Sequence, residues 1–187
     1  APKPGERVAL LIDLEDTDQV KDFAFLKDPS LSVQSLAYKV FYQGLKAGAL
    51  EALELKGGDL FAYARTGGSN LDLPEEAYDP SGKTVRFETE IYPHYDILLC
   101  ISTDSATAPL TASAKQHGFR GATLHGLNEI ILSSGLSVDY NVISQEAERI
   151  RAALNRADGF EVDFEVVGQS CTLRIDCGQQ EAQKSHG

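Results

Sequence analysis

The chain has 187 residues and a mass of 20.3 kDa, which suits one full domain and is short for two. Its side chains are 42% hydrophobic and 24% charged, a balance typical of a globular protein that excludes a disordered or fibrous one. Seventeen basic and 28 acidic side chains give a net charge of -11, so the surface repels phosphate backbones and anionic membranes. We therefore expect neither nucleic acid nor a membrane as a partner, whereas peptides, small molecules and other proteins remain.

The cysteines indicate a reducing compartment. Cys100, Cys171 and Cys177 cannot all pair within one chain and show no CxxC spacing, so we expect reduced core thiols and a cytoplasmic protein. No apolar run approaches the ~20 residues of a membrane span, and the N-terminus lacks the apolar core of a signal peptide. Because the chain contains no methionine, we expect it to be a processed chain or an isolated domain.

The first third of the chain predicts a buried strand followed by a helix. Residues 7–13 form a continuous apolar run, typical of a strand that is buried on both faces of a parallel sheet. An acidic stretch, 13–18, follows at the carboxyl end of that strand. Apolar residues then recur at helical spacing over 32–47 and predict an amphipathic helix that ends at Gly48.

The next segment predicts short strands and a long loop. Residues 49–55 and 60–65 are expected to form strands, joined by a hairpin turn at Lys56-Gly57-Gly58-Asp59. The Gly, Pro, Asn and Asp content of 66–82 predicts a surface loop. Alternating apolar residues over 84–91 predict a half-exposed strand.

A second buried strand is predicted over 95–101. The hydroxyl-rich turn 102–107 follows it and leads into a helix of ~10 residues. A short apolar piece near 121–124 precedes a short helix over 127–134.

The last segment predicts a long helix and a hairpin. Residues 140–157 carry an apolar stripe, with Asp139 as the N-terminal cap and Gly159 as the end. Strands over 160–167 and 171–177 then form a C-terminal β-hairpin. The whole order predicts a single α/β domain over 1–187, with a mixed, largely parallel sheet flanked by helices.

One face of this hairpin is expected to be acidic and the other apolar. Glu161, Asp163 and Glu165 alternate with Val162, Phe164 and Val166. The acidic face should be solvated, and the apolar face should cover the long helix or a partner subunit. Because a terminal hairpin often leaves an unpaired edge, we expect a dimer.

Acidic and hydroxyl side chains follow the two buried strands, where ligands bind in open α/β sheets. Carboxylates are suited to a peptide's amine or basic side chains, and hydroxyls with helix N–H groups to its carbonyls and carboxylate. The alternative is that both turns only cap the helices after them. The expected peptide-binding residues are Asp13, Glu15, Asp16, Asp18, Ser102, Thr103, Asp104 and Ser105.

Catalytic and metal-binding patterns are missing from the sequence. His94, His117, His125 and His186 have no ligand spacing, and there is no G-x-S-x-G or G-x-G-x-x-G motif. We therefore expect no catalytic residue, no metal site and no cofactor.

The segment Asp13-Leu-Glu15-Asp16-Thr17 resembles the haloacid-dehalogenase phosphatase motif, in which an aspartate nucleophile ends a hydrophobic strand. Glu15 stands where that family has aspartate, and the family's later acidic pair for Mg²⁺ has no counterpart here. A phosphatase-like enzyme that uses Asp13 is one alternative reading.

Three segments together resemble the N-terminal domain of the M29 family of metallo-aminopeptidases, the aminopeptidase T type. They are the start at 3–11, the helix and strand entry LAYKVFYQGLKAGAL at 36–50, and the long segment 136–178. They cover roughly half of the chain, and residues 57–95 depart from the family's pattern.

That resemblance implies a non-catalytic role for this chain. In the family the metal ions are held by a separate C-terminal domain, so no residue of 1–187 inherits a catalytic role. We expect a peptide- or partner-binding protein, of the kind that escorts peptide precursors in natural-product pathways. The alternative is the N-terminal fragment of an active metal-dependent aminopeptidase, which would be indicated by a reading frame that continues for ~200 residues.

Overall fold

The computed structural model describes residues 2–183 of the chain. Contacts divide it into two compact units, one that runs to Leu132 and one that begins at Ser133, and each is described by itself. The single domain over 1–187 stays a prediction.

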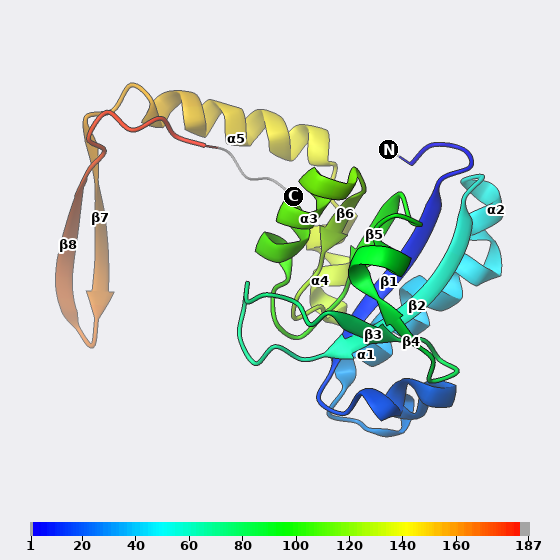
Figure 1. Ribbon diagram of the computed structural model, residues 1–187. Coiled ribbons are helices and arrows are strands. Elements are labelled where there is room, and N and C mark those ends of the chain that lie inside the picture. Colours follow the sequence, from blue (N-terminus) through cyan, green and yellow to red (C-terminus); the bar gives the residue numbers. More distant parts are fainter. Residues whose placement is uncertain (1, 184–187) are drawn as a thin grey trace. The chain divides into compact units, whose positions relative to one another are not determined.

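The first unit is built on a six-stranded sheet with the order β4-β3-β2-β1-β5-β6 (Figure 1). Three of the strand pairings are parallel, and the two pairings that involve β3, at one edge, are antiparallel. This confirms the predicted α/β class with a mixed, largely parallel sheet. The strands are β1 (Arg7–Leu14), β2 (Lys56–Ala64), β3 (Glu76–Tyr78), β4 (Thr84–Arg86), β5 (Ile97–Cys100) and β6 (Arg120–Thr123).

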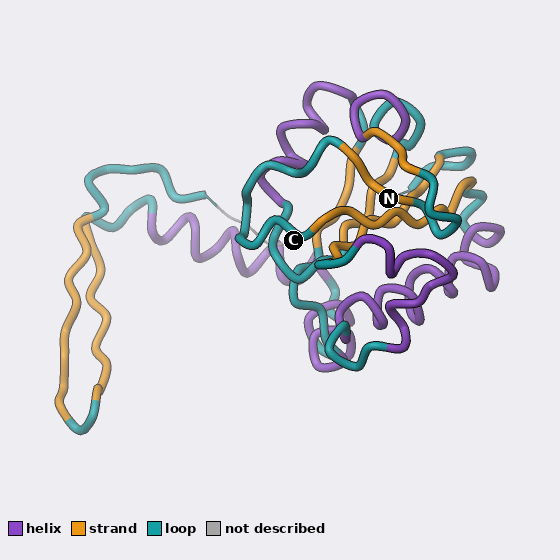
Figure 2. The backbone as a smooth tube through the Cα atoms, turned by 60° about the horizontal axis from the view of Figure 1, so that its bottom comes forward, coloured by secondary structure: helices purple, strands orange, loops and turns teal. Residues whose placement is uncertain are grey.

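Helical segments cover both faces of this sheet (Figure 2). Ala9 and Leu11 of β1 face a core that η4 (Phe87–Ile91) and α3 (Thr107–His117) cover. Leu10 and Ile12 alternate to the other face and are also fully buried, so β1 is covered on both sides, as its apolar run predicts. The segments that follow β1 and return the chain to β2 are η1 (Thr17–Lys27), α1 (Ser32–Leu36), η2 (Ala37–Tyr42), η3 (Leu45–Ala49) and α2 (Leu50–Ala52).

The helix predicted over 32–47 is present and continues to Ala52 through two π-helical turns. The predicted end at Gly48 is wrong. Gly48 has φ 146° and lies inside the helical run, where glycine's freedom at positive φ absorbs the distortion. Ala37 and Leu45 form part of the buried stripe that the spacing predicted.

The predicted hairpin at 56–59 is wrong, because the Gly-Gly pair lies inside one strand. β2 runs through it and pairs with β1 in parallel, with a register shift between Val8 and Ala9. A Cβ on Gly57 would lie 2.7 Å from the Val8 carbonyl oxygen, and Gly57 and Gly58 have φ values of 81° and 75°. The glycines therefore form a bulge at the start of β2, where two backbones approach closely.

The region from 66 to 91 follows the prediction in part. Residues 66–75 are a loop, but the three-residue strand β3 lies inside the predicted 66–82 loop. Only 84–86 of the predicted strand 84–91 is extended, and Phe87–Ile91 closes a helical turn with a bond from the Tyr92 N–H to the Phe87 carbonyl. Phe87 and Ile91 are buried as expected, since a spacing of four also fits one helix face.

The elements from 95 to 134 confirm the prediction. β5 is the second buried strand, and α3 begins at Thr107 and ends at His117, followed by Gly118 in the left-handed conformation typical of a helix C-terminus. β6 and the short helix α4 (Glu129–Ser133) follow.

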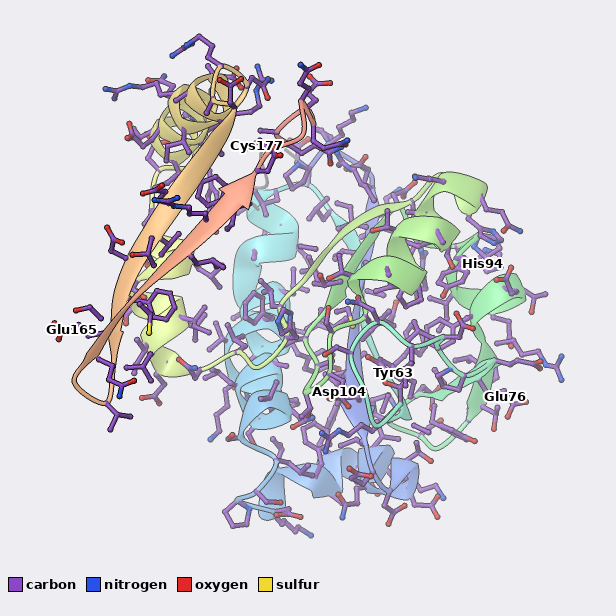
Figure 3. All side chains as sticks on the ribbon, turned by 90° about the vertical axis from the view of Figure 1, so that its left-hand side faces the viewer. Tyr63, Glu76, His94, Asp104, Glu165 and Cys177 are labelled. Atoms are coloured by element: carbon purple, nitrogen blue, oxygen red, sulfur yellow. The ribbon has the colours of Figure 1, made fainter. Side chains whose placement is uncertain are left out.

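The second unit contains η5 (Gly135–Ser137), α5 (Tyr140–Leu154), β7 (Gly159–Val166) and β8 (Gln169–Asp176). The Asp139 side chain accepts a hydrogen bond from the Asn141 N–H at 2.9 Å, which confirms the predicted cap. α5 ends at Leu154 rather than near 157, and β7 and β8 form the predicted antiparallel hairpin. Glu165 lies near its turn and Cys177 at its other end (Figure 3).

The hairpin has the polar and the apolar face that its alternation predicts. Glu161 pairs with Arg174 at 2.7 Å, and the Thr172 hydroxyl donates to Asp163 at 2.6 Å, on one face. The opposite face is apolar and open, with 40–50% of each larger residue exposed. Its members are Phe160, Val162, Phe164, Val166 and Leu173, with Cys171 and Ile175 beside them in register.

Among the described residues, no helix has the length and apolar character that crossing a membrane requires.

Candidate functional site

The two turns predicted to bind a ligand do converge. β1 and β5 are neighbouring parallel strands, and β2 lies on the other side of β1, so the strand order reverses between β1 and β5. In open α/β sheets ligands bind at such a point, outside the carboxyl ends of the strands. The backbone N–H of Thr103 lies 2.8 and 2.9 Å from the two carboxylate oxygens of Asp13, which joins the turns directly.

Asp13 holds this junction together from inside the protein. Only 1% of the residue is exposed, and its Oδ1 also accepts hydrogen bonds from the Gln34 amide at 2.7 Å and the Thr103 hydroxyl at 3.2 Å. The Asp104 N–H donates to Oδ2 at 3.3 Å. A carboxylate surrounded by donors of its own chain has a structural role, which leaves the phosphatase-like reading without support from its geometry.

Gln34 also holds the two turns together. The sequence analysis did not predict a role for this residue. Its amide nitrogen also donates to the Asp13 backbone carbonyl at 2.9 Å and lies 2.9 Å from the Thr103 hydroxyl. The residue is buried, so the helix that follows β1 is fastened to both turns. A glutamine on a predicted apolar helix face is the sequence signal that identifies it.

Arg65 forms ion pairs with one acidic side chain from each turn. It follows β2, and its Nε lies 2.8 Å from Asp104 Oδ2 while its Nη1 lies 2.8 Å from Glu15 Oε1. The hydrogen bond from Arg65 lowers the pKa of Asp104 below its ordinary value, and the same contact raises the pKa of Arg65. Figure 3 shows Asp104 beside the end of β2, where Tyr63 lies. The three side chains form an acid–arginine–acid cluster.

The cluster is only partly open to solvent. The exposed fractions of the side chains are 72% for Glu15, 32% for Arg65 and 17% for Asp104. Glu15 therefore keeps most of its acceptor capacity for a ligand, whereas Asp104 is largely committed to Arg65.

Asp16 and Asp18 do not join this cluster. The Asp16 side chain accepts a hydrogen bond from the Asp18 N–H at 3.0 Å and caps η1, as the capping alternative predicts. Asp18 forms an exposed ion pair with Lys21 at 2.7 Å. Such pairs contribute little to stability or recognition.

The serines of the second turn make hydrogen bonds inside it. The Ser102 hydroxyl is buried and donates to the Asp104 carbonyl at 2.6 Å. The Ser105 hydroxyl lies 3.3 Å from the Asn70 side-chain oxygen and 3.0 Å from the Thr107 hydroxyl. These bonds fix the shape of the turn. Thr107 is the first residue of α3, so the Ser105–Thr107 contact joins the turn to that helix.

A buried polar chain lies beneath the turns. The Tyr63 hydroxyl is 3.6 Å from Cys100 Sγ, and that thiol is 3.7 Å from the Ser102 hydroxyl. Burial raises the pKa of Cys100 to about 11 and also raises the pKa of Tyr63.

Cys100 is the core thiol that the sequence predicts, but Cys171 and Cys177 are partly exposed, so their predicted core placement is wrong. All three are free.

Thiol labelling distinguishes these environments. At pH 8, and at a protein concentration low enough to dissociate the proposed dimer, we expect iodoacetamide to modify Cys171 and Cys177 in the folded protein and to leave Cys100 unmodified, because the thiolate is the reactive form. Mass spectrometry of the digested protein measures each site, and labelling in denaturant provides the control in which all three react. Modification of Cys100 at the rate of Cys171 would contradict its burial.

Residues 2–183 bring together no group of three or more His, Cys, Asp or Glu side chains that could hold a metal ion. His117, at the end of α3, lies 2.8 Å from Glu88 and packs against the Tyr92 ring. His94 lies away from the turns, beside a polar cavity of about 470 Å³ that Arg7, Asp59 and Tyr95 line. His186 lies outside the described residues.

The chain was compared with known proteins at three levels. No protein-family model, no curated protein sequence and no solved structure matches it.

Proposed function

We propose that this chain is a non-catalytic protein that binds a peptide or a protein partner, with its peptide site at the carboxyl edge of the sheet. The observation that carries the proposal is the junction at the strand reversal, where Asp13 fastens the turn after β5 to the end of β1. Such a junction fixes the positions of surface groups before a ligand arrives, which lowers the entropic cost of binding.

The acid–arginine–acid cluster is the polar surface that this junction presents. A peptide's N-terminal ammonium, or a lysine or arginine side chain, is suited to the exposed carboxylate of Glu15. Arg65 can receive the peptide's carbonyl oxygens, since its planar guanidinium has five donors. The net charge of -11 attracts basic peptides, leaves neutral ones without an electrostatic penalty and repels acidic ones.

The resemblance to the N-terminal domain of the M29 metallo-aminopeptidases supports the same function, because that family holds its metal ions in a different domain. The proposal includes a cytoplasmic location, in which the three free cysteines stay reduced, and a homodimer as the assembled form. It requires no cofactor.

Peptide capture tests the proposal. When the immobilised protein is incubated with random pentapeptides bearing free N-termini, we expect basic and neutral sequences to be enriched over acidic ones. The Glu15→Gln variant should bind the enriched peptides about fivefold more weakly, the effect of one partly screened charge-assisted contact. Isothermal titration calorimetry measures the affinities.

Glu51→Gln is the matched control, because it removes the same charge from an exposed side chain on α2, away from the turns. Equal affinities for the two variants would mean that only the overall field attracts the peptide. Capture of no peptide at all would overturn the proposed function.

A further inference from the structure

The strand β6 forms an edge of the sheet beside α3 (Figure 1). The N–H groups of Arg120 and Leu124 donate to the carbonyls of Asp96 and Cys100 on the β5 side. In a parallel ladder alternate residues bond to one side, so the N–H and C=O groups of Gly121 and Thr123 point away from β5. Among residues 2–183, no hydrogen bond is formed by these outward groups.

A groove lies between this edge and α3. It has a volume of about 280 Å³, and its apolar floor consists of Leu98, Leu110, Ala114 and Phe119. That volume accommodates one or two apolar side chains rather than a drug-sized ligand.

Gly121 brings β6 close to β5 beside the groove. It pairs with Leu98, whose side chain faces the α3 core, so position 121 faces the same way. A Cβ at this position would lie 2.2 Å from the Leu98 carbonyl oxygen, which the close approach of the two backbones does not allow. The missing Cβ therefore allows β6 to pack closely against β5, and Gly121 lines the groove with backbone alone.

Hydroxyl groups connect the groove to the carboxyl-edge site. The Ser105 hydroxyl lies 3.0 Å from that of Thr107, which lies 2.6 Å from that of Thr123. Thr107 and Thr123 line the end of the groove that meets the turn after β5. A chain lying along β6 would therefore approach the turn after β5, at Ser105.

We propose that β6 binds a peptide as an added strand, with one apolar side chain of the peptide in the groove between β6 and α3. The inference rests on the proposed function and names the way in which the peptide is held. Strand addition supplies main-chain hydrogen bonds for affinity and a pocket for alternate side chains for specificity.

The occupant is an extended peptide of about four residues, the length of β6, with a central leucine, valine or phenylalanine. The outward donors and acceptors alternate along the edge, a pattern that an extended main chain matches and a helix does not. Flanking residues should be neutral or basic because of the protein's net charge of -11.

The test uses the full chain and a dye-labelled probe, acetyl-Lys-Val-Leu-Val-Lys-amide, followed by fluorescence anisotropy. Thr123→Pro removes the outward N–H without breaking the β5 ladder, and Thr123→Val removes only the hydroxyl. We expect the proline variant to bind about fivefold more weakly and the valine variant to stay within about twofold of the wild type.

A second pair of variants tests the groove and leaves the sequence of β6 unchanged. Ala114→Leu fills the groove from α3, whereas Ala112→Leu adds the same side chain to an exposed position of that helix. We expect Ala114→Leu to weaken probe binding about fivefold or more and Ala112→Leu to leave it unchanged. Thermal melting followed by circular dichroism establishes that each variant is folded, and the α3 pair decides the outcome if Thr123→Pro is not.

The outcomes separate this inference from the proposed function. Loss of binding in Thr123→Pro and Ala114→Leu, with both controls intact, supports strand addition. Probe binding that only Glu15→Gln weakens would overturn strand addition and leave the carboxyl-edge site standing. Failure of the probe to bind at millimolar concentration would also overturn it, while peptide capture from the random library decides the proposed function separately.

Discussion

Replacing Asp13 by alanine is expected to lower the free energy of unfolding by about 3 kcal/mol, because it removes the acceptor for several buried donors at once. The Thr103 N–H, the Gln34 amide and the Asp104 N–H all point at this carboxylate. Alanine leaves them unpaired in a site that water does not reach, since Asp13 is buried. Urea denaturation followed by circular dichroism measures the change.

Two further variants define what Asp13 contributes. Asp13→Asn keeps the shape and one acceptor oxygen, but its NH₂ group faces donors, so we expect a loss of about half that size. Asp18→Ala removes an exposed acid of the same turn and should change stability by less than about 0.5 kcal/mol. A loss below about 1 kcal/mol in Asp13→Ala would show that the junction is not held by this carboxylate, and the proposed site would lose its preorganisation.

Much of the sheet was predictable because its central strands are apolar without interruption. The runs at 7–13 and 95–101 fit only strands covered on both faces, and a parallel sheet brings their carboxyl ends to one edge. The convergence of Asp13 with Thr103 followed from that geometry. The hydrogen bonds inside the turns could not be predicted in the same way, because a carboxylate that binds a ligand and one that binds its own backbone look alike in sequence.

The charge balance of the site depends on a residue far away in the chain. Arg65 is 50 positions from Glu15 and 39 from Asp104, and it lay inside a segment predicted as the second strand of a hairpin. Because the glycines at 57 and 58 form a bulge rather than a turn, the strand runs on and places Arg65 at the carboxyl edge. A local pattern cannot distinguish these two uses of Gly-Gly, since both need positive φ.

The hairpin shows the opposite case, in which the sequence predicts an apolar face that stays partly exposed within the described part of the second unit. A two-stranded ribbon is marginally stable alone in water. Here Phe160, Val162 and Phe164 remain 40–44% exposed on one face. All three acids of β7 lie on the other face, so two copies of the apolar face can meet without like charges between them. A second copy of this chain is therefore the partner that we expect on this surface.

Substituting Phe164 by glutamate is expected to convert a dimer into a monomer. At ~100 µM we expect light scattering to give the mass of a dimer for the wild type, because association buries the aromatic and β-branched side chains of both hairpins. A carboxylate placed in that contact loses its hydration without a partner, a cost of several kcal/mol that raises the dissociation constant by more than about a hundredfold.

The matched control is Asp163→Asn, one position away on the polar face. The asparagine side-chain oxygen can still accept the hydrogen bond from the Thr172 hydroxyl. This variant should remain a dimer at the same concentration, because its side chain stays in solvent when the apolar faces meet. A wild-type protein that is monomeric at ~100 µM would contradict the prediction. A Phe164→Glu protein that is still dimeric would place the contact on another surface, since a buried, unpaired carboxylate and a stable apolar contact cannot occupy the same site.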